Sequence, residues 1–246
     1  MASVTQSRVE IRCAVQKEDA RPNGLHYDSA DDQLFIVDQG DGDLITIDDP
    51  RGARRESVFQ TNSGKPSGVV RTDFGGQDTI FMASTYNLAL TQVRGAEAVE
   101  VDVRGVGTGI VDFAQDLVNG THTGYHGLEW DGDYLWASSP PGKAIFKMKL
   151  EETANGTAVS ECSWFPVAFG NRPHGLAWAD DAKTQIWCND TTLHAAYRYD
   201  AASGECLEIL VLPKDAPDSH GITNFDGHLW YCEDQPPGRI CEVIPL

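Results

Sequence analysis

The chain has 246 residues, of which 41% are hydrophobic, and its formal net charge is −18. This length suits one or two domains, and a repeat that runs almost from end to end favours a single domain, residues 1–246. The acidity, without a basic stripe, argues against nucleic-acid binding and against anionic membrane surfaces, and no apolar run is long enough to span a bilayer.

Short apolar runs separated by turn residues predict an all-β chain, and no long segment has helical periodicity. The first predicted strand is 8–15, at the N-terminus. The remaining predicted strands are 34–37, 44–47, 80–83, 134–137, 145–148, 176–178, 185–188, 195–199, 206–211, 229–232 and 240–244.

A short phrase built around a glycine opens each group of these strands. Its glycines recur 44 to 59 residues apart. Four short strands per unit at this period are typical of a propeller blade. The five copies of the phrase are Asn23-Gly24-Leu25, Ser67-Gly68-Val69, His126-Gly127-Leu128, His174-Gly175-Leu176 and His220-Gly221-Ile222.

The fold class is therefore a single β-propeller with five four-stranded blades, and six blades of about 41 residues are the alternative. The last unit has only three strands, so we expect the N-terminal strand to join that blade and close the ring. Cys13 and Cys241 would then lie on adjacent strands, within reach of a disulfide if the register matches. The longer third spacing predicts a loop at 106–123.

The residue before each repeat glycine is expected near one mouth of the central channel. Read around the ring, this position holds Asn23, Ser67, His126, His174 and His220. Three imidazoles converging on an axis are suited to Zn, Fe, Cu or Ni, and they leave positions free for water or substrate. The alternative is that these histidines only cap strands and hydrogen-bond between blades.

A second ring of positions follows the second strand of each unit. It holds Asp38, Ser84, Ser139, Asp190 and Glu233. Asp190 and Glu233 flank the histidine units, so either is a candidate general base or a partner that orients an imidazole, and solvated turn carboxylates are the alternative. Asp234 could exchange roles with Glu233.

Other candidates are weaker. Tyr86 and Tyr125 could each reach the mouth as an acid or hydrogen-bond donor. Glu129 and His26 occupy matching places three residues after their phrases begin, and strand alternation turns both off the axis. The Asp38–Asp43 segment superficially suggests a calcium loop, but its spacing favours a tight hairpin.

Two phrases resemble known propeller families. Arg21-Pro-Asn-Gly-Leu25, followed by Leu34-Phe-Ile-Val-Asp38, resembles the gluconolactonase/regucalcin and strictosidine-synthase-like propellers. That resemblance implies that Asn23 lies beside a catalytic metal. Separately, a calcium ion elsewhere in the channel stays open as an alternative. Arg172-Pro-His-Gly-Leu-Ala-Trp178 is similar to streptogramin lyase and the NHL-type propellers. Resemblance to the peptide-amidating lyase of that wider group implies that the three channel histidines hold zinc. These relatives typically have six or seven blades.

The expected function is a metal-dependent enzyme acting on a small organic molecule at the channel. Lactone or ester hydrolysis is the first choice, and a lyase or cyclase, including cycloaddition, is the second. A ligand-binding propeller without turnover is the alternative from another class. We expect a monomer. A cytoplasmic location and secretion with a removed signal both remain open.

Overall fold

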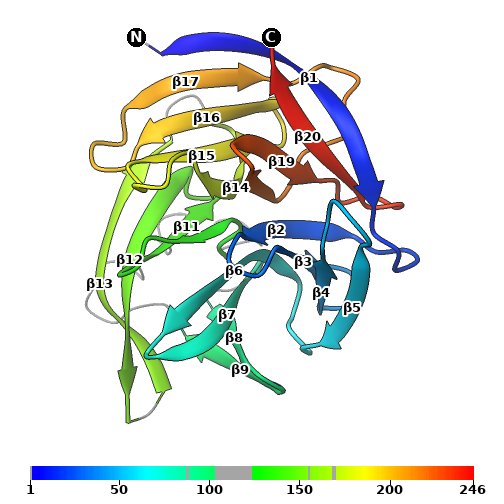
Figure 1. Cartoon of the computed structure of the whole chain (residues 1–246). Coiled ribbons are helices and arrows are strands. Elements are labelled where there is room, and N and C mark those ends of the chain that lie inside the picture. Colours follow the sequence, from blue (N-terminus) through cyan, green and yellow to red (C-terminus); the bar gives the residue numbers. More distant parts are fainter. Residues whose placement is uncertain (1, 87–88, 103–123, 155, 168–169) are drawn as a thin grey trace.

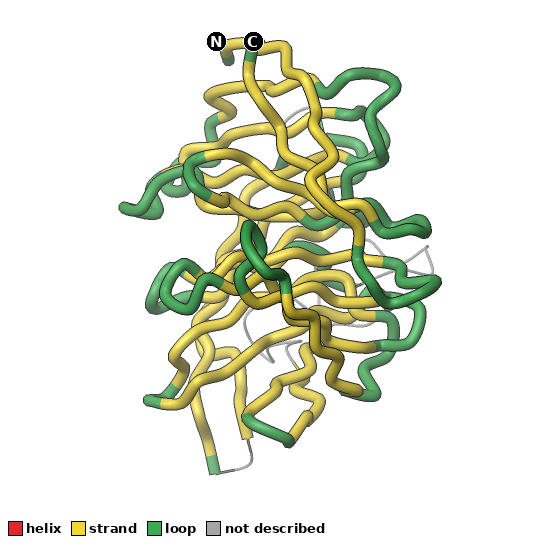
Figure 2. The backbone as a smooth tube through the Cα atoms, turned by 45° about the vertical axis from the view of Figure 1, so that its right-hand side comes forward, coloured by secondary structure: helices red, strands yellow, loops and turns green. Residues whose placement is uncertain are grey.

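The computed structural model describes residues 2–86, 89–102, 124–154, 156–167 and 170–246. Within these ranges the chain forms strands, turns and loops and contains no helix (Figure 2). The fold is all-β and propeller-like. The predicted loop at 106–123 lies outside the described residues.

Three antiparallel sheets have four strands each, paired in chain order. The first contains β2 Pro22–Asp28, β3 Gln33–Asp38, β4 Asp43–Asp48 and β5 Arg55–Gln60. The second contains β6 Pro66–Phe74, β7 Gln77–Ser84, β8 Ala89–Arg94 and β9 Glu97–Asp102. The third contains β10 Leu128–Trp130, β11 Leu135–Ser139, β12 Ala144–Thr153 and β13 Gly156–Pro166.

The remaining strands form one eight-stranded sheet in the order β14-β15-β16-β17-β1-β20-β19-β18. Its first half contains β14 Pro173–Trp178, β15 Gln185–Asp190, β16 Ala195–Asp200 and β17 Cys206–Val211. Its second half, which we call the closing group, contains β18 Ile222–Phe225, β19 His228–Cys232, β20 Arg239–Pro245 and β1 Ser3–Ala14.

The N-terminal strand β1 joins the two halves. Residues Ser7 to Ala14 pair antiparallel with β20, as the incomplete last unit predicted. Residues Ser3 to Gln6 pair parallel with β17, which the sequence did not indicate. Figure 1 shows β1 in blue beside β20 in red, with both termini at the same end of the molecule. Because β1 occupies both edges, neither β17 nor β20 is left exposed.

Cys13 and Cys241 are on these paired strands, but both are free thiols. A bulge between Ile11 and Cys13 shifts the register, so that Cys13 lies opposite Ile240 and Cys241 lies opposite Ile11. Cys13 packs against the apolar cluster that contains Ile240, whereas Cys241 belongs to a different cluster. The two thiols therefore face opposite sides of the sheet, and the possible disulfide does not form.

The apolar core is divided among five clusters, each of which lies between two neighbouring strand groups. The cluster between the first and second sheets contains Val37 and Val69, and the cluster between the second and third sheets contains Val70 and Leu128. The other three clusters join the third sheet to β14–β17, β14–β17 to the closing group, and the closing group to the first sheet. Burial of each large apolar side chain contributes roughly 1.5–3 kcal/mol. The core thus runs in a circle around the inner strands.

The inner strands β2, β6, β10, β14 and β18 contact one another at the centre. At the repeat glycines their backbones meet without space for a side chain. A Cβ on Gly127 would lie 2.4 Å from the carbonyl oxygen of His174, and one on Gly24 would lie 2.8 Å from the Cα of Gly68. The same relation links Gly68 to His126, Gly175 to His220 and Gly221 to Gly24, so that the close approaches form a closed cycle.

Candidate functional site

The residues before the repeat glycines lie at irregularities of the inner strands. In β2 the register shifts between Pro22 and Gly24, and in β6 it shifts between Pro66 and Gly68. In β14 it shifts between Pro173 and Leu176, around His174. Such bulges redirect a side chain away from the regular alternation. All five residues at this position are buried: Asn23, Ser67, His126, His174 and His220.

The three histidines form a row around one end of the axis. The Nδ1 atom of His126 lies 2.7 Å from the Nε2 atom of His174. The ring centroids of His126 and His174 are 4.3 Å apart, those of His174 and His220 are 4.7 Å apart, and both ring pairs are nearly perpendicular. The structure therefore brings the predicted histidines together as consecutive neighbours.

Burial favours the neutral form of two of these imidazoles, those of His174 and His220. Burial lowers the pKa of His174 well below its ordinary value, and the neighbouring His126 and His220 lower it further. Burial also lowers the pKa of His220, against the opposing charge of Asp234, whose Oδ2 lies 3.3 Å from His220 Nε2. Neutral imidazole is the form that binds a metal ion, so the protonation state suits the predicted site.

Several buried polar atoms at this end have no hydrogen-bond partner. They include Asn23 Oδ1, His174 Nδ1 and His220 Nδ1. Buried polar groups are almost always paired, so these orphaned atoms indicate a missing ligand or ion. By donor type the residues fit a divalent transition metal. In this conformation, however, the three histidines do not bring three nitrogens within mutual reach, since among the described residues only Asp38, Asp41 and Asp43 form such a group.

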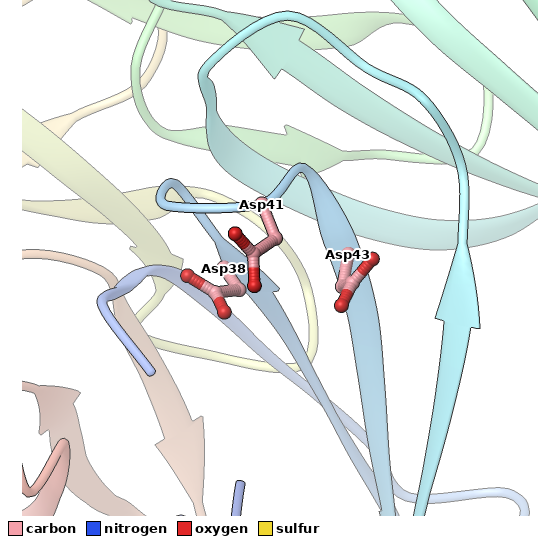
Figure 3. Close-up of side chains that lie close together, drawn as sticks. All are labelled: Asp38, Asp41 and Asp43. Atoms are coloured by element: carbon pink, nitrogen blue, oxygen red, sulfur yellow. The ribbon is translucent and has the colours of Figure 1, made fainter. Parts of the chain in front are cut away.

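That acidic group is already occupied by a lysine. The Nζ atom of Lys17 lies 2.9 Å from Asp41 and from Asp43 and also contacts Asp38 (Figure 3 shows the three carboxylates). Burial works against the charge of Lys17, but the three carboxylates outweigh it and raise its pKa. Burial also works against ionisation of Asp38, but hydrogen bonds from Lys17 and the backbone of Arg21 and Gly40 lower its pKa overall. The ammonium group of Lys17 therefore supplies the positive charge that balances these carboxylates.

Two candidate bases of the second ring are engaged in structural contacts. Asp190 Oδ2 accepts hydrogen bonds from the backbone N–H groups of Asn171 and Arg172, and its Oδ1 accepts from Thr192 and Leu193. Glu233 pairs with Arg239 through both carboxylate oxygens, each at 2.5 Å. These contacts favour a structural role for both carboxylates, because Asp190 accepts four backbone hydrogen bonds and Glu233 is held by an arginine. Asp234 instead reaches His220.

The two serines of the second ring also bind nearby backbone. Ser139 accepts a hydrogen bond from Gly142 N–H, and Ser84 donates to the carbonyl of Gly64. Together with Asp38 and Asp190, they stabilise the loops that follow the second strands. The second ring therefore holds the loops at this end in place.

The tyrosines and Ser67 differ in their surroundings. Tyr125 is fully buried, 5.5 Å from Phe146 in the core between the second and third sheets, and burial raises its pKa. Ser67 Oγ donates to the carbonyl of Tyr125 at 2.8 Å. Tyr86 is 45% exposed in the loop between β7 and β8. The burial of Tyr125 and its place in the apolar core favour packing over acid catalysis.

The sequence did not lead us to predict three residues that support the histidine row: Ser138, Asn189 and Ser219. Ser138 Oγ donates to the carbonyl of His174 and accepts from Gly127 N–H. Asn189 accepts a hydrogen bond from Gly175 N–H and donates to Ser219. Ser138 and Asn189 share one repeat position, which holds Val37, Ala83 and Cys232 in the other units. A polar residue at this position occurs only in two of the histidine units, and this pattern could have indicated that Ser138 and Asn189 support the histidines.

Comparison with known proteins supports the fold. No family model matches the chain, and no curated protein matches it in sequence. A glutaminyl cyclase from Myxococcus xanthus has a TM-score of 0.62 and 14% identity, over 99% of this chain and 100% of that one. The chain shares the fold of this protein.

Two further solved structures are of the type that the sequence phrases resemble. A gluconolactonase from Xanthomonas campestris has a TM-score of 0.59 and 12% identity, over 98% of this chain and 90% of that one. A calcium-binding protein, regucalcin, from Agrobacterium tumefaciens has a TM-score of 0.58 and 11% identity, over 100% and 96%. The resemblance to gluconolactonase/regucalcin-type propellers is confirmed at the level of the fold.

Proposed function

We propose that the chain is a metal-dependent enzyme that acts on a small organic molecule at the histidine end of the axis. The observation that carries the proposal is the row of three buried histidines, in which the Nδ1 atoms of His174 and His220 have no hydrogen-bond partner. His126, His174 and His220 would hold the ion, with Asn23 Oδ1 beside them. The metal is a divalent transition ion, because imidazole nitrogen suits Zn, Cu, Fe and Ni better than calcium.

A bound ion of this kind polarises a carbonyl oxygen and lowers the pKa of bound water. Asp234 orients His220 by facing its Nε2 atom, which favours the tautomer with the proton on Nε2 and leaves the Nδ1 lone pair available. Asp234 also takes the proton-transfer role in place of Asp190 and Glu233, because its oxygens are not saturated by backbone N–H groups or by an arginine. Burial of the imidazoles excludes water from their inner side.

The proposed substrate is a lactone or an ester, because attack at a polarised carbonyl requires the groups present here. Ring closure at a glutaminyl carbonyl is the second candidate. It is favoured by the similarity in fold to a glutaminyl cyclase over nearly the full length of both chains. A binding protein without turnover is the third possibility, and the assay below separates it from the other two.

We further propose a monomer of five four-stranded blades that forms one domain over residues 1–246. Support comes from the closed cycle of repeat glycines and from the five apolar clusters between neighbouring strand groups. Among the described residues, the cycle of close approaches runs through five inner strands, which supports five blades over six.

The test is an activity screen with aliphatic lactones, aryl esters and glutaminyl peptides, using metal-loaded protein. His174→Ala and Asp234→Asn are compared with Glu97→Gln, an exposed and distant carboxylate. We expect turnover of one substrate class, with loss in the first two variants and none in the control. Metal binding without turnover in any class would favour a binding protein. Turnover that survives His174→Ala would overturn the proposed site.

A further inference from the structure

A large cavity lies at the end of the axis opposite the histidines. The far ends of β2, β6, β10, β14 and β18 enclose a volume of about 910 Å³. The repeat glycines and the residues after them separate it from the histidine row, since the space among them is too small for a water molecule. The cavity is therefore a distinct compartment, within the size range of small-molecule sites.

Glu129 of β10 lines this cavity and is only 6% exposed. The lysine that shares the lining does not pair with it at hydrogen-bond distance, since Lys183 Nζ donates to the carbonyl of Trp130 at 2.8 Å. Burial raises the pKa of Glu129 to about 8, against the opposing influence of Lys183 and of the Trp130 and Trp178 backbones. A buried carboxyl group without a cationic partner stays protonated until a cation beside it stabilises the ionised form.

The other charges of the lining leave a surplus of carboxylates. The cavity contains the acidic residues Asp28, Glu129, Asp180, Asp181 and Asp226 and the basic residues Arg71 and Lys183. Arg71 is already committed, because it pairs with Asp28, Asp31 and Asp78. Asp226 is paired with Arg51. Asp180 and Asp181 therefore outnumber Lys183 among the remaining charges even when Glu129 is protonated, which favours a cation over an anion.

A second polar atom of the lining is unsatisfied. His26 Nδ1 is buried and has no hydrogen-bond partner. Burial lowers the pKa of His26 to about 4, so the ring is neutral and can accept a hydrogen bond. The indoles of Trp130 and Trp178 and the ring of Tyr27 supply apolar surface beside these polar groups. Aromatic surface combined with a carboxylate is the usual environment for an organic ammonium group.

An inorganic ion fits the cavity less well than an organic one. The lining sets aromatic rings beside the carboxylates, which suits an organic ammonium ion better than a bare metal ion. We propose that this cavity binds a small organic amine as its ammonium ion, with the Glu129 carboxylate as counter-ion and His26 Nδ1 as hydrogen-bond acceptor. The site is independent of the reaction proposed at the histidine end.

Binding has a proton balance that can be measured. Glu129 is protonated in the empty cavity and ionised beside the ammonium group, so its proton passes to the buffer. The other titratable or charged groups that line the cavity are His26, Tyr27 and Asp28 from β2, Arg71 from β6, Asp180, Asp181 and Lys183 after β14, and Asp226 after β18. Glu129→Gln removes the group that is expected to release the proton, so a release that disappears in this variant is assigned to Glu129.

The experiment is isothermal titration with n-butylamine and with n-butanol at about pH 7.5, below the raised pKa of Glu129. Titrations in two buffers of different ionisation enthalpy count the protons released. We expect saturable binding of the amine with release of up to one proton, and no binding of the alcohol. Glu129→Gln is expected to weaken binding by about 30-fold or more and to abolish the proton release.

Glu97→Gln removes the same charge at an exposed site and is expected to leave both measurements unchanged. His26→Gln provides a second variant in the cavity, with weaker amine binding but intact proton release. Equal binding of amine and alcohol, unchanged binding in a folded Glu129→Gln variant, or an equal loss in Glu97→Gln would each overturn the proposal.

Discussion

His126 Nδ1 lies 2.7 Å from His174 Nε2, although the two residues are 48 positions apart in the chain. The contact arises because both histidines precede a repeat glycine on neighbouring inner strands. Gly127 in turn packs directly against the carbonyl of His174. The same backbone crowding that closes the axis therefore also sets the spacing of the imidazoles.

The tight packing of the repeat glycines predicts a large stability loss for Gly127→Ala. The added Cβ would lie 2.4 Å from a carbonyl oxygen and 2.5 Å from a backbone nitrogen of β14. Overpacking of this kind typically costs about 1–3 kcal/mol, and rigid backbone neighbours place the expected loss at the upper end. Urea unfolding measures the difference. Gly64→Ala, where a Cβ meets nothing, is the control and should change stability by less than about 0.5 kcal/mol.

Substitutions of Asp190 and Asp234 are expected to have different effects, the first on stability and the second on function. Asp190→Ala removes an acceptor of four backbone N–H groups and is expected to destabilise the protein by about 2–4 kcal/mol. Asp234→Asn should change stability by less than about 1 kcal/mol, because Asp234 is nearer the surface, while reducing metal affinity or turnover through His220. Chemical unfolding and metal titration of both variants test the contrast. The opposite pattern would return the proton-transfer role to Asp190.

Lys17 is expected to be essential to the acidic group around it. Lys17→Met leaves the carboxylates of Asp38, Asp41 and Asp43 without a counter-ion and should cost about 3–5 kcal/mol. Calcium should restore part of the stability of this variant and should not stabilise the wild type at this position. Thermal unfolding with and without calcium measures both effects. A variant that calcium does not rescue would show that the carboxylates cannot adapt to a metal.

The raised pKa of Glu129 predicts that the free energy of unfolding falls as the pH rises. Its folded pKa of about 8 lies above the ordinary value of 4.5, so the folded state holds the proton more tightly than the unfolded state. The penalty is absent below pH 4.5, grows as the pH rises towards 8 and is complete above it. Its upper limit is about 5 kcal/mol, at about 1.4 kcal/mol for each pKa unit. Unfolding of wild type and Glu129→Gln from acidic to alkaline pH measures it, and parallel curves would contradict it.

Much of the fold was predictable because the repeat phrase marks a position that geometry constrains. A glycine is required wherever inner strands touch, so Gly24, Gly68 and Gly127 located those strands. The incomplete last unit likewise predicted the pairing of β1 with β20, which is confirmed. The parallel pairing of Ser3 to Gln6 with β17 was not predictable, because it depends on how far β1 extends past the end of β20.

The site was predictable only in part. The repeat position brought the histidines together, but the partners of Asp190 and Glu233 depend on loop conformations that no periodic pattern encodes. The bulge near Cys13 puts its side chain on the opposite face of the sheet from Cys241, so the register that a disulfide would need is not formed. Glu129 and His26 were ranked low because they point away from the histidine mouth, and both line the opposite cavity.

The most direct test of the central proposal is elemental analysis of the purified protein, with wild type beside His174→Ala. His174 lies between the other two histidines and has an orphaned Nδ1 atom. The proposal predicts about one transition-metal ion per chain in the wild type and its loss in the folded variant. A wild-type protein that binds no metal after incubation with Zn²⁺, Fe²⁺, Cu²⁺ and Ni²⁺ would contradict it, as would a His174→Ala variant that retains the full metal content.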